Sequence, residues 1–164
     1  MKMQLVLLMI LSTMLFINCE KEYRADDTPA NLLDYEINYG TSFRMCVGHC
    51  RKEMNLVNNE LNFTVFYTEG RGAVGGIPKT YKETSDKVLQ NDLSKSIDYE
   101  SFKKLNTIIG CPDCADGGAE WVEIIKGNIK HKVIFEYGKA PKEIESLVTI
   151  LREKRVYFEE KYLK

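Results

Sequence analysis

The segment 119–138, with the sequence AEWVEIIKGNIKHKVIFEYG, constrains the fold more than any other part of this chain. Its second half alternates, with Val133 and Phe135 on the apolar side of a strand and lysines on the opposite side. Gly127 and Asn128 separate the two halves and suit the tight turn of a hairpin. The segment therefore predicts two antiparallel strands with one buried face.

The first half of the chain contains further strand patterns. Residues 34–39 (DYEINY) alternate polar and apolar side chains and predict a first strand. Residues 54–59 and 60–69 predict two more strands that turn at Asn58 and Asn59. Alternate apolar residues in the last of these strands mark its buried face.

Two helices complete the pattern. Residues 96–109 (SIDYESFKKLNTII) predict a helix with apolar side chains near one side. Ser96 or Asp98 is suited to cap the amino terminus of this helix. A second helix is predicted from Pro141 to Tyr162, with an apolar stripe at helical spacing. Residues 79–92, which precede the first helix, are a weaker candidate for an edge strand.

The order of strands, helix, hairpin and helix predicts an α+β fold. We expect an antiparallel sheet of two hairpins, with one middle helix and a C-terminal amphipathic helix packed on it. His131 lies in the apolar register of its strand, and we expect it to be a sheet histidine without a catalytic role. The predicted core consists of Phe63, Val65, Trp121, Ile124, Val133, Phe135, Ile144, Leu147 and Leu151.

The amino-terminal segment indicates export. Lys2 precedes a nearly uninterrupted apolar run at residues 4–17, which has the length of a secretory signal and is shorter than a bilayer span of about 20 residues. The run ends at Asn18 and Cys19, and the next residues are mostly charged. This arrangement resembles a bacterial lipoprotein signal, in which the cysteine after the apolar run is lipidated. The alternative is a cleaved signal peptide that leaves Cys19 unmodified.

The resemblance to lipoprotein signals divides the chain into three parts. Residues 1–18 are the expected signal peptide, residues 19–32 a flexible tether, and residues 33–164 a single domain. Acyl chains on Cys19, such as palmitate, would attach the protein to the membrane, and two or more chains make such attachment stable. The expected location is the bacterial cell envelope, facing the periplasm or the cell surface.

The charge balance limits the classes of partner. Removal of residues 1–18 leaves 146 residues with a formal charge of −2. Acidic and basic residues are interspersed, and no basic stripe is present. Nucleic acid is therefore not an expected partner. The two histidines do not support a serine–histidine–acid set, and no paired carboxylates stand out. We expect a non-catalytic interaction or binding module with an unknown protein partner.

The remaining cysteines are Cys46, Cys50, Cys111 and Cys114. An even number in an exported chain favours disulfides, and four cysteines allow three pairings. No cofactor is then expected. The main alternative is a tetrahedral zinc site formed by these four thiolates, or by His49 and three of them.

A third hypothesis is a periplasmic thiol oxidoreductase that uses the C-x-x-C motif. Such motifs normally follow a strand and open a helix, whose amino terminus lowers the thiol pKa. Here the predicted helix precedes Cys111, and the turn ADGGAEW follows Cys114. The local pattern therefore lacks the feature that activates a thiolate.

Three segments carry a second resemblance. YGTSFRMCVGHC (39–50), GCPDCADGGAEWVEI (110–124) and VIFEYGKAPKEIESLVTILREK (133–154) resemble a group of small bacterial exported lipoproteins of unknown function. The resemblance implies one compact domain and no particular activity. Because simpler relatives carry only the C-x3-C pair, it also implies local disulfides, Cys46 with Cys50 and Cys111 with Cys114.

Overall fold

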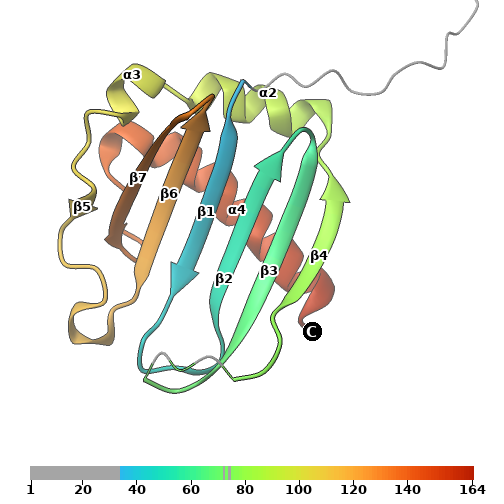
Figure 1. Ribbon diagram of the computed structural model, residues 1–164, viewed down its shortest axis with the longest axis vertical. Helices are drawn as coiled ribbons and strands as arrows, with labels where there is room; N and C mark the ends of the chain where they lie inside the picture. The colour runs from blue at the N-terminus through green and yellow to red at the C-terminus, as the bar shows by residue number, and fades with distance from the viewer. Residues whose placement is uncertain (1–33, 72, 74) are drawn as a thin grey trace, which may run out of the picture.

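The computed structural model describes residues 34–71, 73 and 75–164. The predicted signal peptide and the whole predicted tether, with Cys19, lie outside the described residues. The described chain forms one seven-stranded sheet with the order β4-β3-β2-β1-β6-β7-β5 (Figure 1). The strands are β1 (Glu36–Ser42), β2 (Val47–Val57), β3 (Glu60–Glu69), β4 (Lys79–Thr84), β5 (Ile108–Ile109), β6 (Ala119–Lys126) and β7 (Ile129–Glu136).

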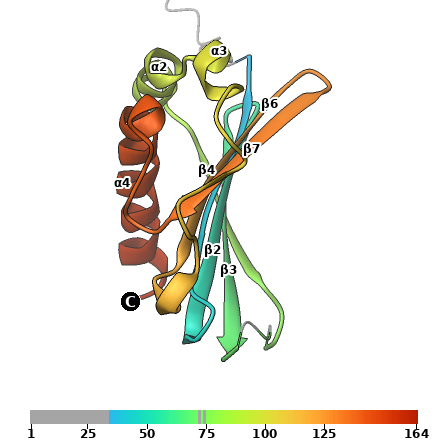
Figure 2. The same cartoon turned by 90° about the vertical axis from the view of Figure 1, so that its left-hand side faces the viewer.

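The α+β class is confirmed, although the sheet is larger than two hairpins. Every neighbouring pair of strands is antiparallel except β5 and β7, which run parallel. Helix α4 (Glu145–Tyr162) crosses one face of the sheet (Figures 1 and 2). Within the described part of the chain no helix packs on the other face, which we call the open face. None of the described helices is long and apolar enough to cross a bilayer.

The predicted helix over residues 96–109 is wrong. Only the one-turn helix α3 (Tyr99–Phe102) lies within this range, whereas α2 (Lys87–Ser96) precedes it and ends where the predicted helix would begin; both lie at one end of the sheet (Figure 1). Asp86 caps α2 and Asp98 caps α3, each by accepting a backbone N–H with its side chain. Asp98 is thus a cap as predicted, but of a one-turn helix. The last residues of the predicted helix form β5 instead, because they pair with β7.

Strand boundaries also differ from the sequence pattern. The edge strand predicted within 79–92 is β4, but it ends at Thr84 because Asp86 starts α2. Strand β2 begins at Val47, inside the cysteine motif and seven residues before the start predicted at residue 54. An irregularity in its pairing with β3, between Gly48 and Arg51, accommodates the motif.

The core lies between the sheet and the helices. All nine predicted core residues are buried, and eight belong to the cluster beneath α4. Trp121 is the exception, because strand alternation turns Val122 and Ile124 toward α4 and Trp121 toward the open face. There the indole lies against Gly40, and the side chain of Lys132 covers it. Trp121 is therefore shielded by long polar side chains and not by the helix.

Candidate functional site

Both cysteine motifs lie at one end of the sheet, which we call the cysteine end. Cys46 and Cys50 lie between β1 and the body of β2, and Cys111 and Cys114 lie between β5 and β6. The two loops are neighbours because the last pair of the β1–β6 ladder is Ser42 with Ala119. Each motif forms its own disulfide, with Cα–Cα distances of 5.7 Å for the first and 5.4 Å for the second. These are the local pairings that the resemblance implied.

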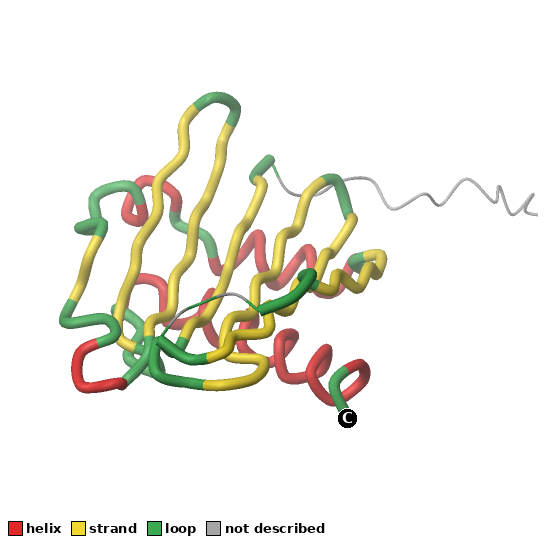
Figure 3. Tube along the Cα trace, turned by 60° about the horizontal axis from the view of Figure 1, so that its bottom comes forward, coloured by secondary structure: helices red, strands yellow, loops and turns green. Residues whose placement is uncertain are grey.

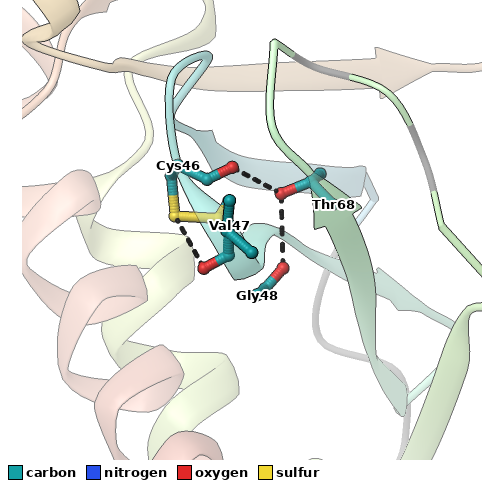
Figure 4. The surroundings of a disulfide bond; sticks show 5 residues. Cys46, Val47, Gly48 and Thr68 are labelled. Atoms are coloured by element: carbon teal, nitrogen blue, oxygen red, sulfur yellow. Dashed lines mark hydrogen bonds between the residues drawn. A yellow bond between two sulfur atoms is a disulfide. The ribbon is translucent and has the colours of Figure 1, made fainter.

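The first disulfide is held against strand β3. The Thr68 hydroxyl contacts two carbonyls of the motif, at 3.0 Å from the Cys46 oxygen and 3.3 Å from the Gly48 oxygen (Figure 4). Gly48 has a φ of 105°, a conformation that residues with a side chain rarely adopt. Cys50 is buried, whereas Val47 between the cysteines points outward and is 67% exposed. The disulfide therefore presents an apolar side chain at the surface.

The second disulfide closes an exposed corner that leads into β6. The backbone N–H of Cys111 donates to the Glu136 carboxylate at 3.1 Å, and the N–H of Asp113 donates to the Gly118 carbonyl at 3.1 Å. The Lys139 ammonium and the Cys111 N–H lower the pKa of Glu136. A single 3-10 turn (Cys114–Asp116) follows the motif before β6 begins. This corner supplies no α-helix to activate a thiolate, as the sequence indicated.

Phe43 joins the two loops. Its N–H donates to the Cys50 carbonyl at 3.1 Å, while its ring packs edge-on against Tyr137 with centroids 4.7 Å apart. The same ring covers Gly118, where an added Cβ would lie 2.5 Å from a ring carbon. The loops are consequently fixed relative to each other, although each disulfide is local.

A pocket of about 290 Å³ opens beside the first disulfide, between β3, β4 and the end of α4. We call it the tyrosine pocket. His49 packs edge-on against Tyr67 with centroids 6.1 Å apart, and Tyr81 stacks on Tyr162 at 4.4 Å. The tyrosine pocket is lined by His49, Val65, Tyr67, Ile77, Lys79, Tyr81, Tyr162, Leu163 and Lys164.

Two residues in the lining of this pocket expose apolar side chains. Ile77 is 96% exposed, and Tyr67 is also exposed although it lies on a strand. We call Tyr67 and Ile77, together with the exposed Met45 and Val47 of the first disulfide loop, the apolar rim. Gly75, two residues before Ile77, is held against β3, because its N–H donates to the Tyr67 carbonyl at 2.8 Å. Sequence reasoning missed this site, because the residues come from three separate segments and each is unremarkable alone.

The lining of the tyrosine pocket contains cations but no carboxylate. Lys79 and Lys164 are its charged residues, and Glu160 approaches Lys164 to 3.9 Å from outside the lining. An anionic group entering the pocket would therefore meet two ammonium groups, while the Glu83 carboxylate, which accepts a hydrogen bond from the Tyr162 hydroxyl at 3.0 Å, lies just behind the wall. The other lining residues are His49, three tyrosines and three aliphatic residues.

The zinc ligand set is not assembled. Cys46, Cys50, Cys111, Cys114 and His49 are all described, and no group of three or more metal-ligating side chains is found among the described residues. The zinc alternative remains a prediction that a metal assay on the purified protein would test.

His131 has structural partners. Its Nε2 lies 3.0 Å from the Leu105 carbonyl, and its ring packs edge-on against Phe102 with centroids 5.3 Å apart. Both partners belong to the segment that covers this edge of the sheet. The contacts are those expected of a sheet histidine that ties a connecting segment to a strand.

A buried polar network beneath α4 escaped the sequence analysis. Glu120 is fully buried and accepts hydrogen bonds from the Tyr39 hydroxyl at 2.5 Å and from two guanidinium nitrogens of Arg152 at 2.9 and 2.6 Å. The Gly138 N–H donates to the same carboxylate at 3.1 Å. The bond with Glu120 raises the pKa of Arg152, and burial together with Glu120 raises the pKa of Tyr39.

This network ties α4 to the cysteine end. Glu120 is the second residue of β6, directly after the corner that the second disulfide closes. Arg155, one turn of α4 after Arg152, pairs with Glu159 and approaches the Tyr137 hydroxyl at 3.5 Å. A charged residue in an apolar strand carries no sequence signal for its partner, so the network could not be predicted.

Comparison with known proteins adds no functional assignment. No protein-family model matches the chain, and no curated protein matches its sequence.

Proposed function

We propose that this protein is a lipid-anchored component of the bacterial envelope that binds a partner protein through its cysteine end, without catalysis. One observation carries the proposal: the tyrosine pocket, whose lining includes the exposed Tyr67 and Ile77, opens beside the first disulfide loop through His49, and Phe43 ties that loop to the second one. Exposed apolar side chains that gather around a pocket mark interaction sites. A rigid site also lowers the entropic cost of association.

The position of this site supports the same role. Strand β1 runs from Glu36, close to where the described chain begins, to Ser42 at the cysteine end. Seven residues of strand separate the two ends by about 20 Å. A lipid on Cys19 would hold the first end near the membrane and leave the cysteine end directed away from it.

The chemistry of the pocket indicates the kind of partner. An apolar or aromatic side chain would fill the space between His49, Tyr67 and Tyr81. An acidic group beside that anchor would meet Lys79 and Lys164. We therefore propose a partner surface with an apolar anchor flanked by carboxylates, in keeping with the few buried anchors that dominate protein interfaces.

Photo-crosslinking in intact bacterial cells tests the proposal. A photoreactive residue at Ile77 of the full chain is expected to give a discrete adduct with one partner. The matched control is Val156, which is 43% exposed on α4 and lies outside the pocket lining. Lys79→Glu combined with Lys164→Glu should weaken the Ile77 adduct at least several-fold. No adduct at Ile77, or equal adducts at both positions, would contradict the proposal.

Mass spectrometry tests the anchoring step separately. The membrane-extracted protein is expected to begin at a diacylated Cys19, and Cys19→Ser should release it from the membrane fraction. A mature chain that starts at another residue, or that stays unacylated, would overturn the lipid anchor while leaving the crosslinking result to be judged on its own.

A further inference from the structure

The β6–β7 hairpin extends past the rest of the sheet, at the end opposite the cysteine end (Figures 2 and 3). The ladder between β1 and β6 stops at Glu36 with Ile125, whereas β6 and β7 continue to pair as far as Lys126 with Ile129. The tip therefore stands clear of β1. Ile129 at the tip is 64% exposed, which is unusual for an isoleucine in a strand.

The tip is basic. Residues 124–135 include Lys126, Lys130 and Lys132 and contain no aspartate or glutamate. The whole chain, in contrast, has slightly more acidic than basic residues. Acids of neighbouring elements lie close by. On α3, Asp98 caps the helix and Glu100 lies 2.6 Å from Lys103. Asp34 and Glu36 line the same hollow as Gly127, and Glu36 accepts a hydrogen bond from Asn55 at 3.0 Å. The hairpin itself still carries only positive charges next to an exposed apolar side chain.

The described chain begins beside this hairpin. Asp34 and Gly127 line the same surface hollow, and Tyr35 packs against Tyr99 with ring centroids 5.5 Å apart. The Lys126 ammonium lies over both rings, at 5.2 Å and 5.6 Å from the centroids. Tyrosine and lysine are residues that favour the interface between a bilayer and water.

The length of the segment before Asp34 limits how far this end can lie from an anchor. Fourteen residues, and therefore fifteen residue-to-residue steps, separate Cys19 from Asp34. Even fully extended they span only about 50 Å. A lipid on Cys19 would therefore keep the hairpin within reach of the bilayer at a high effective concentration, so that weak contacts suffice to orient the domain.

We propose that the tip of the β6–β7 hairpin docks on the anionic surface of the membrane to which the protein is anchored. Lys126 and Lys130 attract acidic headgroups, and Ile129 enters the interfacial region. This inference rests on the proposed lipid anchor, which supplies the proximity. Docking of the hairpin orients the tyrosine pocket away from the bilayer, toward a partner.

Hydrogen exchange on the full-length protein tests the docking. The protein is reconstituted into vesicles of phosphatidylcholine alone and into vesicles that also contain phosphatidylglycerol. The amides of residues 126–131 are expected to exchange several-fold more slowly in the vesicles with phosphatidylglycerol. High salt should remove the difference, because it screens the headgroup charge. Lys126→Glu combined with Lys130→Glu should also remove it.

Two controls separate the possible failures. Lys79→Glu combined with Lys164→Glu changes the charge equally at the cysteine end and should keep the protection. If loss of the Lys126 contacts unfolds the hairpin, Lys130→Glu alone replaces the double variant, because the Lys130 side chain is exposed. The single variant should then reduce the protection. Equal exchange in both vesicles, or equal loss of protection in the control, would overturn hairpin docking. Flotation with phosphatidylcholine vesicles reports the lipid anchor independently, because those vesicles offer no net charge to the hairpin.

Discussion

Gly40 lies directly beneath the indole of Trp121, its partner in the β1–β6 ladder. A Cβ built on Gly40 would come within 2.1 Å of the ring carbon Cζ2. Arg51 and Lys132 lie over the same indole, at 5.7 Å and 4.8 Å from its centroid. The absence of a side chain at Gly40 is therefore what allows the ring to lie flat on the open face.

We predict that Gly40→Ala destabilises the protein by about 1–3 kcal/mol, because the indole must move from its site. The sign is informative, since alanine in place of glycine in a strand otherwise stabilises by about 0.5–1 kcal/mol. Trp121 is the only tryptophan, so its fluorescence reports the displacement directly. In a Trp121→Val background, Gly40→Ala should no longer lower the free energy of unfolding. An unchanged loss of stability there would contradict the explanation.

The buried carboxylate of Glu120 gives a second prediction. Glu120→Ala should lower the free energy of unfolding by about 3–5 kcal/mol, because it leaves Arg152 and the Tyr39 hydroxyl without their buried partner. Glu123→Ala is the matched control, since Glu123 lies on the open face of the same strand and accepts one hydrogen bond from Asn38. Denaturant unfolding measures the free energy of unfolding of both variants. Similar losses in the two would contradict a special contribution of the buried network to stability.

Tyr39 should make stability sensitive to alkaline pH. Burial and the Glu120 carboxylate raise the pKa of Tyr39 above its ordinary value of about 10. Because the folded value is the higher one, this contribution is fully present below about pH 10 and declines as the pH rises beyond it. The stability difference between the native protein and Tyr39→Phe should therefore shrink above pH 10. A difference that stays constant between pH 8 and pH 11, measured by denaturant unfolding, would contradict the raised pKa.

Local patterns predicted the elements, whereas contacts between distant segments decided the faces and partners. The alternation of β7 and the stripe of α4 were read correctly, because each depends on its own periodicity. Trp121 was placed in the predicted core together with Ile124, although strand alternation puts these two residues on opposite faces. Its partner on the open face, Gly40, is distant in sequence, and only the strand register reveals the pair.

The middle of the chain shows the same limit. The pattern of residues 96–109 resembles a helix, yet Ile108 and Ile109 pair with β7 and Asp98 starts a new turn. Pairing with an existing strand satisfies backbone groups that a helix would satisfy locally, so tertiary structure overrides the local preference. The tyrosine pocket was equally invisible, since β4, the first disulfide loop and the end of α4 form it together.

Leu147 provides a test of how α4 packs. Its side chain is 1% exposed beneath the helix, within the core cluster. Leu147→Ala is expected to cost about 2–5 kcal/mol, which combines lost burial with the cavity left behind. Thr149→Ala, on the exposed side of the same helix, should change stability by less than about 1 kcal/mol. A Leu147→Ala protein as stable as this control would show that α4 does not pack as described.

The two disulfides should differ in their resistance to reduction. Cys111 and Cys114 are both exposed, whereas Cys50 is 2% exposed behind the Thr68 contacts. A limiting amount of a water-soluble phosphine should therefore open the Cys111–Cys114 bond first, as measured by alkylation and peptide mapping under native conditions.

Glu136→Ala should increase the rate of Cys111–Cys114 reduction several-fold by freeing the Cys111 N–H, while Glu143→Ala should not. In the native protein the same acceleration is expected as the pH falls through the lowered pKa of Glu136, because protonation weakens its hold on the loop. Earlier reduction of Cys46–Cys50, or insensitivity to Glu136, would contradict the exposed corner as described.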